Sequence, residues 1–115
     1  MTQNTRTTGS VHEKQAAAFL ERKGFSILAR NYRCRSGEID IVAKDGAYLV
    51  FVEVKYRATG RSGSALEAID RKKANQVRRT AAVYLYENHY PEDTPCRFDA
   101  VGIDGDEICH MENAF

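Results

Sequence analysis

The sequence predicts an α/β sandwich in which helices cover a mixed sheet, and three observations support this fold class. A helical pattern opens the chain, and three strand-like segments follow it. A second helical pattern then separates them from two further strands. This order, α-β-β-β-α-β-β, favours a layered structure. The length of 115 residues fits one hydrophobic core, and 43% hydrophobic with 29% charged residues is ordinary for a globular domain.

Two segments have the apolar spacing of amphipathic helices. Residues 11–23 have a broad apolar stripe, and Gly24 follows where a C-terminal glycine cap belongs. In the second segment, residues 64–87, Ser64 and Glu67 form a capping-box pattern that predicts where the helix begins. Each helix therefore has an apolar face that a sheet could cover.

Five segments rich in β-branched and aromatic residues are typical of strands. They span residues 25–32, 38–44, 47–55, 96–103 and 107–111. Asp45-Gly46 predicts a tight two-residue hairpin between the second and third strands, because glycine accepts the positive φ that such a turn requires. Asp104-Gly105 predicts a similar connection between the last two strands.

The register of the central hairpin decides which polar side chains meet. A two-residue turn at Asp45-Gly46 pairs residues whose numbers sum to 91. Glu38 then faces Glu53, and Asp40 lies diagonal to Glu53. Because side chains repeat every two residues, Asp40 and Glu53 share a side of the sheet with Glu38 and Lys55. A shift of two residues would keep these side chains together.

Three carboxylates at this point of an apolar sheet repel one another and would destabilise the fold if nothing compensated them. A divalent cation resolves the conflict, since Mg²⁺ or Mn²⁺ prefers oxygen ligands. Lys55, two residues after Glu53, can orient an attacking water and offset developing negative charge. The pattern therefore suits metal-assisted hydrolysis of a phosphodiester. A partly buried ion network among these side chains is the structural alternative.

Three sequence motifs resemble the YraN-like family of bacterial proteins. They are GEIDIVA at residues 37–43, VFVEVKYR at residues 50–57 and CRFDAV at residues 96–101. The resemblance covers nearly the whole chain, from Glu13 to the closing NAF at residues 113–115. That family is assigned by similarity to the PD-(D/E)XK nucleases, close to archaeal Holliday-junction resolvases. The resemblance thus implies a restriction-endonuclease-like fold and a Mg²⁺- or Mn²⁺-dependent endonuclease activity on DNA, with branched or damaged structures as candidate substrates.

The resemblance also implies roles for individual residues. Asp40 matches the metal-binding aspartate of the superfamily, Glu53 the acid of the (D/E)XK motif, and Lys55 its lysine. Glu13, in the first helix, matches a helical glutamate that often completes such metal sites. His12 stands where the family pattern often has glycine just before this glutamate, a departure that concerns the helix entry and not the carboxylate.

Two further groups belong to the same motifs. Glu38 is part of the GEID signature and is either a supporting acid or an ion-pair partner for Arg33 or Arg35, of which we favour the ion pair. The backbone carbonyl of Val54 is an expected additional metal ligand.

Positive charge is concentrated in one part of the chain. Residues 55–79 hold eight Lys and Arg against two acids, whereas residues 87–112 hold eight acids against one Arg, within a net charge of only +1. Such a polarised surface can track phosphates. For Lys73 the alternative is a lysine that lies along the apolar stripe, and for the whole segment a solvated helix face. The candidate nucleic-acid contacts are Arg57, Arg61, Lys73, Gln76 and Arg79.

Two rival functions use the same residues. One is a non-catalytic nucleic-acid-binding module on the nuclease scaffold, whose affinity would fall steeply with salt. The other is a structural domain in which the carboxylates only form ion pairs. DNA is the expected partner of the nuclease, and a homodimer would suit a two-stranded substrate, although no interface signal is present in the sequence.

Several classes of protein do not fit the sequence. The longest apolar stretch, residues 48–52, is far shorter than a membrane span needs. Residues 1–9 are polar and Thr-rich, which predicts a flexible tail without the apolar core of a signal peptide, followed by a single domain over residues 10–115. Three cysteines without CxxC spacing argue against a disulfide framework or a zinc site, and we expect a cytoplasmic protein.

Overall fold

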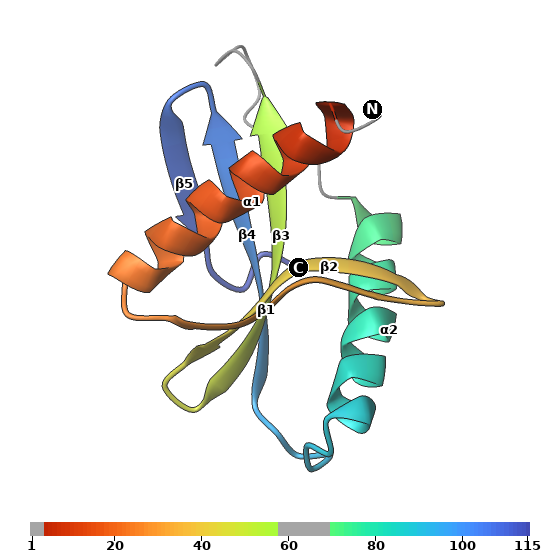
Figure 1. Cartoon of the computed structure of the whole chain (residues 1–115). Coiled ribbons are helices and arrows are strands. Elements are labelled where there is room, and N and C mark those ends of the chain that lie inside the picture. Colours follow the sequence, from red (N-terminus) through yellow and green to blue (C-terminus); the bar gives the residue numbers. More distant parts are fainter. Residues whose placement is uncertain (1–3, 58–69) are drawn as a thin grey trace.

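A computed structural model of the chain describes residues 4–57 and 70–115 (Figure 1). The predicted order α-β-β-β-α-β-β is confirmed. The elements are α1 (Asn4–Arg22), β1 (Ser26–Cys34), β2 (Gly37–Asp45), β3 (Tyr48–Arg57), α2 (Arg71–Glu87), β4 (Cys96–Asp104) and β5 (Glu107–Met111). Neither of these two helices is both long enough and apolar enough to cross a bilayer.

The five strands form one sheet in the order β1-β2-β3-β4-β5. Neighbouring strands are antiparallel except for β3 and β4, which are parallel from Leu49↔Cys96 to Arg57↔Asp104. A parallel pair needs a crossover connection, and α2 lies within it. The sheet is therefore mixed, as the sequence predicts.

Each face of the sheet is covered by one helix. On β3, Val50 and Val52 pack with α1, whereas Leu49 and Phe51 pack with α2, as the alternation of side chains along a strand requires. The α1 side of the core is built around Ala16, Leu20, Phe25, Ile41, Val101 and Ile103, and the α2 side around Ile39, Val42, Val77, Ala81 and Tyr84. Figure 1 shows α1 lying across the strands and α2 running beside β1 and β2.

Both helices begin at residues other than those predicted. α1 begins at Asn4, within the segment expected to be a flexible tail. Apolar periodicity marks only the part of a helix that is docked on the core, and once that part is fixed, helical hydrogen bonds extend through polar residues at little cost. α1 therefore extends beyond the predicted helix of residues 11–23 at its N-terminal end.

The second helix is shorter than the predicted one. α2 begins at Arg71, and Asp70 is its N-cap: the backbone there is extended, and the side chain accepts a hydrogen bond from the Lys73 amide. A single helix over residues 64–87 is therefore excluded, because Asp70 interrupts it. The predicted capping box of Ser64 and Glu67 lies outside the described residues.

The register of the central hairpin differs by two residues from the predicted one. Asp45 pairs with Tyr48, and Ile41 pairs with Val52, so paired numbers sum to 93 instead of 91. The turn consists of Gly46 and Ala47, with Gly46 at φ 60° in its first position instead of its second. A shift of two leaves the side chains of the paired residues, 41–45 and 48–52, on their predicted faces.

Asp99 connects β4, β5 and the residues after β5. Its fully buried carboxylate accepts hydrogen bonds of 2.9 Å from Nε and Nη2 of Arg97, and the Asn113 amide donates to it at 3.0 Å. His110 Nε2 lies 2.8 Å away, and its Nδ1 is 2.7 Å from Lys23 Nζ, just beyond α1. Burial alone would raise the pKa of Asp99, but these hydrogen bonds outweigh it and lower the pKa to about 2.

We predict that Asp99→Asn destabilises the fold by about 3 kcal/mol, because it leaves Arg97 without a buried partner. Urea unfolding at neutral pH measures the change. Glu112→Gln is the matched control: Glu112 is 3.9 Å from Arg97 on an exposed side chain, and its loss should cost less than about 0.5 kcal/mol. Equal losses for the two variants would contradict the assignment of Asp99 as the central partner.

Candidate active site

The site lies where β2 and β3 separate. Their pairing ends at Ile41↔Val52, and beyond that point Oδ2 of Asp40 accepts a hydrogen bond of 2.8 Å from the Val54 amide. A side-chain carboxylate thus replaces the backbone carbonyl that a continuing ladder would supply. Ile39 packs on the α2 side and Ile41 on the α1 side, although they are two residues apart, so β2 turns about its own axis at Asp40. In Figure 1, β2 leaves β3 here and runs toward α2.

α1 brings Glu13 to this point. Glu13 is one helical turn before Ala16 and Ala17, whose small buried side chains hold that face of the helix close to the sheet. Only 9% of Glu13 is exposed. His12, which stands where the family pattern often has glycine, stacks on Tyr56 with ring centroids 3.6 Å apart and so fixes this part of α1 against the end of β3.

Three carboxylates from two elements meet in one cluster. Glu13, Glu38 and Asp40 each offer an oxygen atom within 4.8 Å of the other two. Glu38 also lies 3.5 Å from Arg33 Nε, which confirms the favoured ion pair. Glu38 is therefore both the ion-pair partner of Arg33 and a member of the acid cluster.

Glu53 approaches the same place from β3. It is 4% exposed, between two apolar neighbours in the strand, and its Oε2 lies 3.3 Å from Lys73 Nζ on α2. Lys55, two residues further along β3, is half-buried, and its charge lowers the pKa of both Asp40 and Glu53. The structure thus places the four predicted residues Glu13, Asp40, Glu53 and Lys55 around the point where the strands part. Their roles as ligands and catalyst stay predictions.

The electrostatics show that the negative charge is not fully compensated. Burial, and then repulsion from Asp40, raises the pKa of Glu13 and the pKa of Glu53 to about 7 each. Burial also raises the pKa of Asp40, although the hydrogen bond from the Val54 amide opposes this. One oxygen of Glu13 and one of Glu53, Oε1 in both, are buried and have no hydrogen-bond partner within residues 4–57 and 70–115. Such atoms are costly in a folded protein unless something else binds them.

These features fit a hard divalent cation. Mg²⁺ and Mn²⁺ take oxygen ligands, and buried carboxylate oxygens without a partner are the donors such an ion would satisfy. Glu13, Glu38 and Asp40 could hold it, and Glu53, whose charge interacts with that of Asp40 and whose Oε1 is buried, is a further candidate ligand. The described structure differs from the predicted site in one respect: Glu38 is the third member of the mutual oxygen cluster, and Glu53 faces Lys73.

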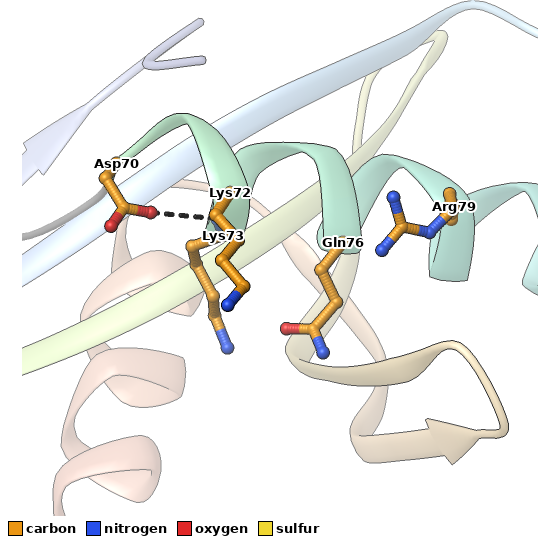
Figure 2. Close-up of a pocket in the computed structure, with 5 residues that line it drawn as sticks. All are labelled: Asp70, Lys72, Lys73, Gln76 and Arg79. Atoms are coloured by element: carbon orange, nitrogen blue, oxygen red, sulfur yellow. Dashed lines mark hydrogen bonds between the residues drawn. The ribbon is translucent and has the colours of Figure 1, made fainter.

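A pocket of about 270 Å³ lies along α2, and Asp70, Lys72, Lys73, Gln76 and Arg79 line it (Figure 2). Lys73 connects it to the site, because its ammonium also contacts Glu53. Three of the five residues predicted to contact nucleic acid are therefore gathered in one pocket. Gln76 packs closely on Gly37 of β2, where a Cβ would lie 2.7 Å from the Gln76 Cγ. Of the other two, Arg57 ends β3, and Arg61 lies outside the described residues.

Asn31 is the site residue that the sequence analysis missed. It lies in β1 between the pairs Arg30↔Ile41 and Tyr32↔Ile39, level with Asp40, and has a φ of 56°. Its side chain hydrogen-bonds to Glu13 and lowers the pKa of that carboxyl. An asparagine inside an otherwise strand-forming segment was the available signal, because asparagine tolerates left-handed backbone that marks bulges and strained sites.

The fold and the site together define a small α/β protein with a carboxylate–lysine site at a fork between two strands. The model of the family described as "Uncharacterised protein family UPF0102" matches residues 12–103. The chain is 51% identical to a UPF0102 protein of Lachnoclostridium phytofermentans over 97% of this chain and 95% of that protein. It is 46% identical to a UPF0102 protein of Symbiobacterium thermophilum over 96% of this chain and 98% of that protein. It is 41% identical to one of Shewanella loihica over 95% of this chain and 94% of that protein. The protein belongs to the UPF0102 family, as its YraN-like motifs predict.

We predict that Glu53→Gln stabilises the protein in the absence of metal by on the order of 2 kcal/mol above pH 8 and has little effect at pH 4. Folding raises the pKa of the Glu53 carboxyl from 4.5 to about 7. The free energy of unfolding of the wild-type protein therefore decreases as pH increases through this range, because the unfolded chain releases the proton first. Glutamine has no such titration. Thermal unfolding in EDTA across this pH range measures the difference, and a gain that is independent of pH would contradict it.

A second expectation concerns Asn31. Asn31→Gly keeps the positive φ accessible but removes the side chain that hydrogen-bonds to Glu13, so the pKa of Glu13 should increase further. Carboxyl ¹³C NMR titration of the two proteins measures this pKa. An unchanged Glu13 pKa would show that the hydrogen bond has no part in the charge balance of the site.

Proposed function

We propose that this protein is a metal-dependent nuclease-type enzyme that hydrolyses phosphodiester bonds in DNA on a restriction-endonuclease-like scaffold. The observation that supports this most strongly is the cluster of Glu13, Glu38 and Asp40 at the strand fork, with Glu53 close enough to Asp40 for their charges to interact. Glu13 and Glu53 each have a buried oxygen atom that finds no hydrogen-bond partner within residues 4–57 and 70–115. The resemblance of the GEID and EVK motifs to PD-(D/E)XK nucleases supports the same reaction class. Function belongs to the site and not to the fold, so the residues are the basis of the proposal.

Each residue has a role that its environment allows. The Val54 amide fixes the Asp40 carboxylate, and the neighbouring Val54 carbonyl is a candidate ligand. Lys55 is close enough to lower the pKa of Asp40 and Glu53, and its ammonium can orient water and offset charge on the phosphate. Glu13, whose carboxylate lies within 4.8 Å of that of Asp40, could hold the ion or accept a proton from the attacking water. A bound Mg²⁺ or Mn²⁺ would supply Lewis-acid polarisation of the phosphate.

Nucleic acid is the substrate class that the surroundings of the site favour. Among the described residues that line the pocket along α2, Lys72, Lys73 and Arg79 face the carboxylate of Asp70, and Lys73 also contacts Glu53. Phosphate groups are the anions that such a row of cations would track. DNA is the first polymer to test, in branched, flapped, damaged and single-stranded forms.

One observation favours a second candidate, a nucleic-acid-binding module without catalysis. Lys73 already forms an ion pair with Glu53 in the described structure, at 3.3 Å, and the basic pocket does not require a metal to exist. Such a module would bind DNA equally well in EDTA and in Mg²⁺. Its affinity would fall steeply with salt, and no substrate would be cleaved.

We predict that Asp40→Asn and Glu53→Gln each reduce Mg²⁺- or Mn²⁺-dependent cleavage by at least about a hundredfold, more than the loss of a supporting hydrogen bond around a metal would cost. Gel assays on the DNA panel measure cleavage, and calorimetry measures metal binding by the same proteins. Glu112→Gln, an exposed acid outside the site, is the control for contaminating nuclease and should cleave normally.

The outcomes separate the candidates. Cleavage by all three variants would assign the activity to a contaminant. Metal-independent DNA binding by the wild-type protein, without turnover on any substrate, would favour the binding module.

A further inference from the structure

Lys73 faces two environments. Its Nζ lies 3.3 Å from Glu53 Oε2, and the same side chain lines the pocket along α2. The Lys73 side chain is 31% exposed, whereas that of Glu53 is 5% exposed. In Figure 2 the side chains of Lys72 and Lys73 extend together from the first turn of α2, with Gln76 one turn further along. A small rotation of a flexible side chain can therefore move this ammonium between Glu53 and the pocket.

The pocket has the charge and size of a site for a single anionic group. Of the described lining residues, Lys72, Lys73 and Arg79 are cations and Asp70 is the one acid, and Asp70 already accepts a hydrogen bond from the Lys73 amide as the N-cap of α2. A volume of about 270 Å³ is just below the usual range of about 300 to 1,000 Å³ for small-molecule pockets. One phosphate group with its flanking atoms fits this description better than a stacked base, since the lining contains no aromatic side chain.

A divalent cation on Glu53 and the ammonium of Lys73 would compete for the same carboxylate. Both are positive, and Glu53 Oε2 contacts Lys73, while Oε1 finds no partner in the described part of the chain. A metal at Glu53 would therefore repel Lys73 toward the only other environment it contacts in the described structure, the pocket. An anion in the pocket would attract Lys73 in the same direction.

We infer that the pocket along α2 binds one phosphodiester group of the substrate, and that Lys73 becomes available to it when a divalent cation takes its place on Glu53. This inference rests on the proposed function, because it assumes that Glu53 is a metal ligand. It goes further by linking two sites: metal binding and phosphodiester binding favour each other. Thermodynamic reciprocity requires the two affinities to change by the same factor.

The test measures the dissociation constant of dimethyl phosphate by NMR shifts of the α2 amides, in EDTA and in saturating Mg²⁺, at pH 8 and constant ionic strength. Dimethyl phosphate is a phosphodiester monoanion too small to reach beyond the pocket. The wild-type protein should bind it at least about fivefold more tightly with Mg²⁺, the lower end of usual coupling between sites. In Lys73→Gln the ratio of the dissociation constant in EDTA to that in Mg²⁺ should fall to about one. Mg²⁺ binding by this variant, measured by calorimetry without the anion, should be as tight as in wild type or tighter.

Lys72→Gln is the matched control, since it removes the same charge from the same pocket without touching Glu53. It should weaken dimethyl phosphate binding in both conditions and keep the Mg²⁺-dependent ratio. The inference fails if Lys73→Gln keeps the wild-type ratio, which would mean that the metal itself holds the anion, or if the wild-type ratio is one. Absence of Mg²⁺ binding to wild type would instead remove the proposed function, so the two failures are distinguishable.

Discussion

The hydrogen bond from the Val54 amide to the Asp40 carboxylate lies at the end of the paired part of β2 and β3, and both the sheet and the site depend on it. When the two strands separate, a backbone amide in the middle of the sheet loses its partner. The carboxylate satisfies that amide and is itself held in place, close to Glu13 and Glu38. The same separation lets β2 turn toward α2, so that residues from both helices converge on one point.

Convergence from both faces of the sheet has an energetic cost. Glu13 and Glu53 are buried and Asp40 is half-buried, next to a core of Val, Ile and Ala side chains, and their raised pKa values show that the ionised forms are disfavoured there. Lys73 and Lys55 compensate only part of the charge. This is the pattern expected of a functional site, where local instability is tolerated because the rest of the fold is stable. The fully satisfied network around Asp99 shows how the same chain treats a buried carboxylate that is structural.

The order of elements and the strand positions were predictable because hydrophobic alternation and glycine turns are local signals. The side of the sheet that Glu53 and Lys55 share was predictable for the same reason, since a register error of two residues does not change it. The start of α2 was not predictable, because Ser64 with Glu67 and Asp70 with Lys73 offer competing N-terminal signals and only the packing decides. The polar beginning of α1 carries no periodicity that could mark a helix.

Other parts of the site depend on contacts between distant residues. No local pattern states that Lys73 reaches Glu53, or that the Asn31 side chain supports Glu13. The split of the acids into a Glu13–Glu38–Asp40 cluster and a Glu53–Lys73 pair follows from the turn of β2 at Asp40, which strand periodicity does not anticipate.

The contact between Gly37 and Gln76 limits how the α2 pocket can be redesigned. Behind the Gln76 side chain lies the main chain of β2, at a glycine whose φ of 149° other residues rarely adopt. The wall on this side therefore has no side chain that mutagenesis could trim. Shortening residue 76 would widen the pocket down to the backbone and no further, whereas a larger residue there would push against the β1–β2 turn. Engineering of ligand preference thus has more freedom at the exposed Lys72 and Arg79 than at the buried end of the pocket.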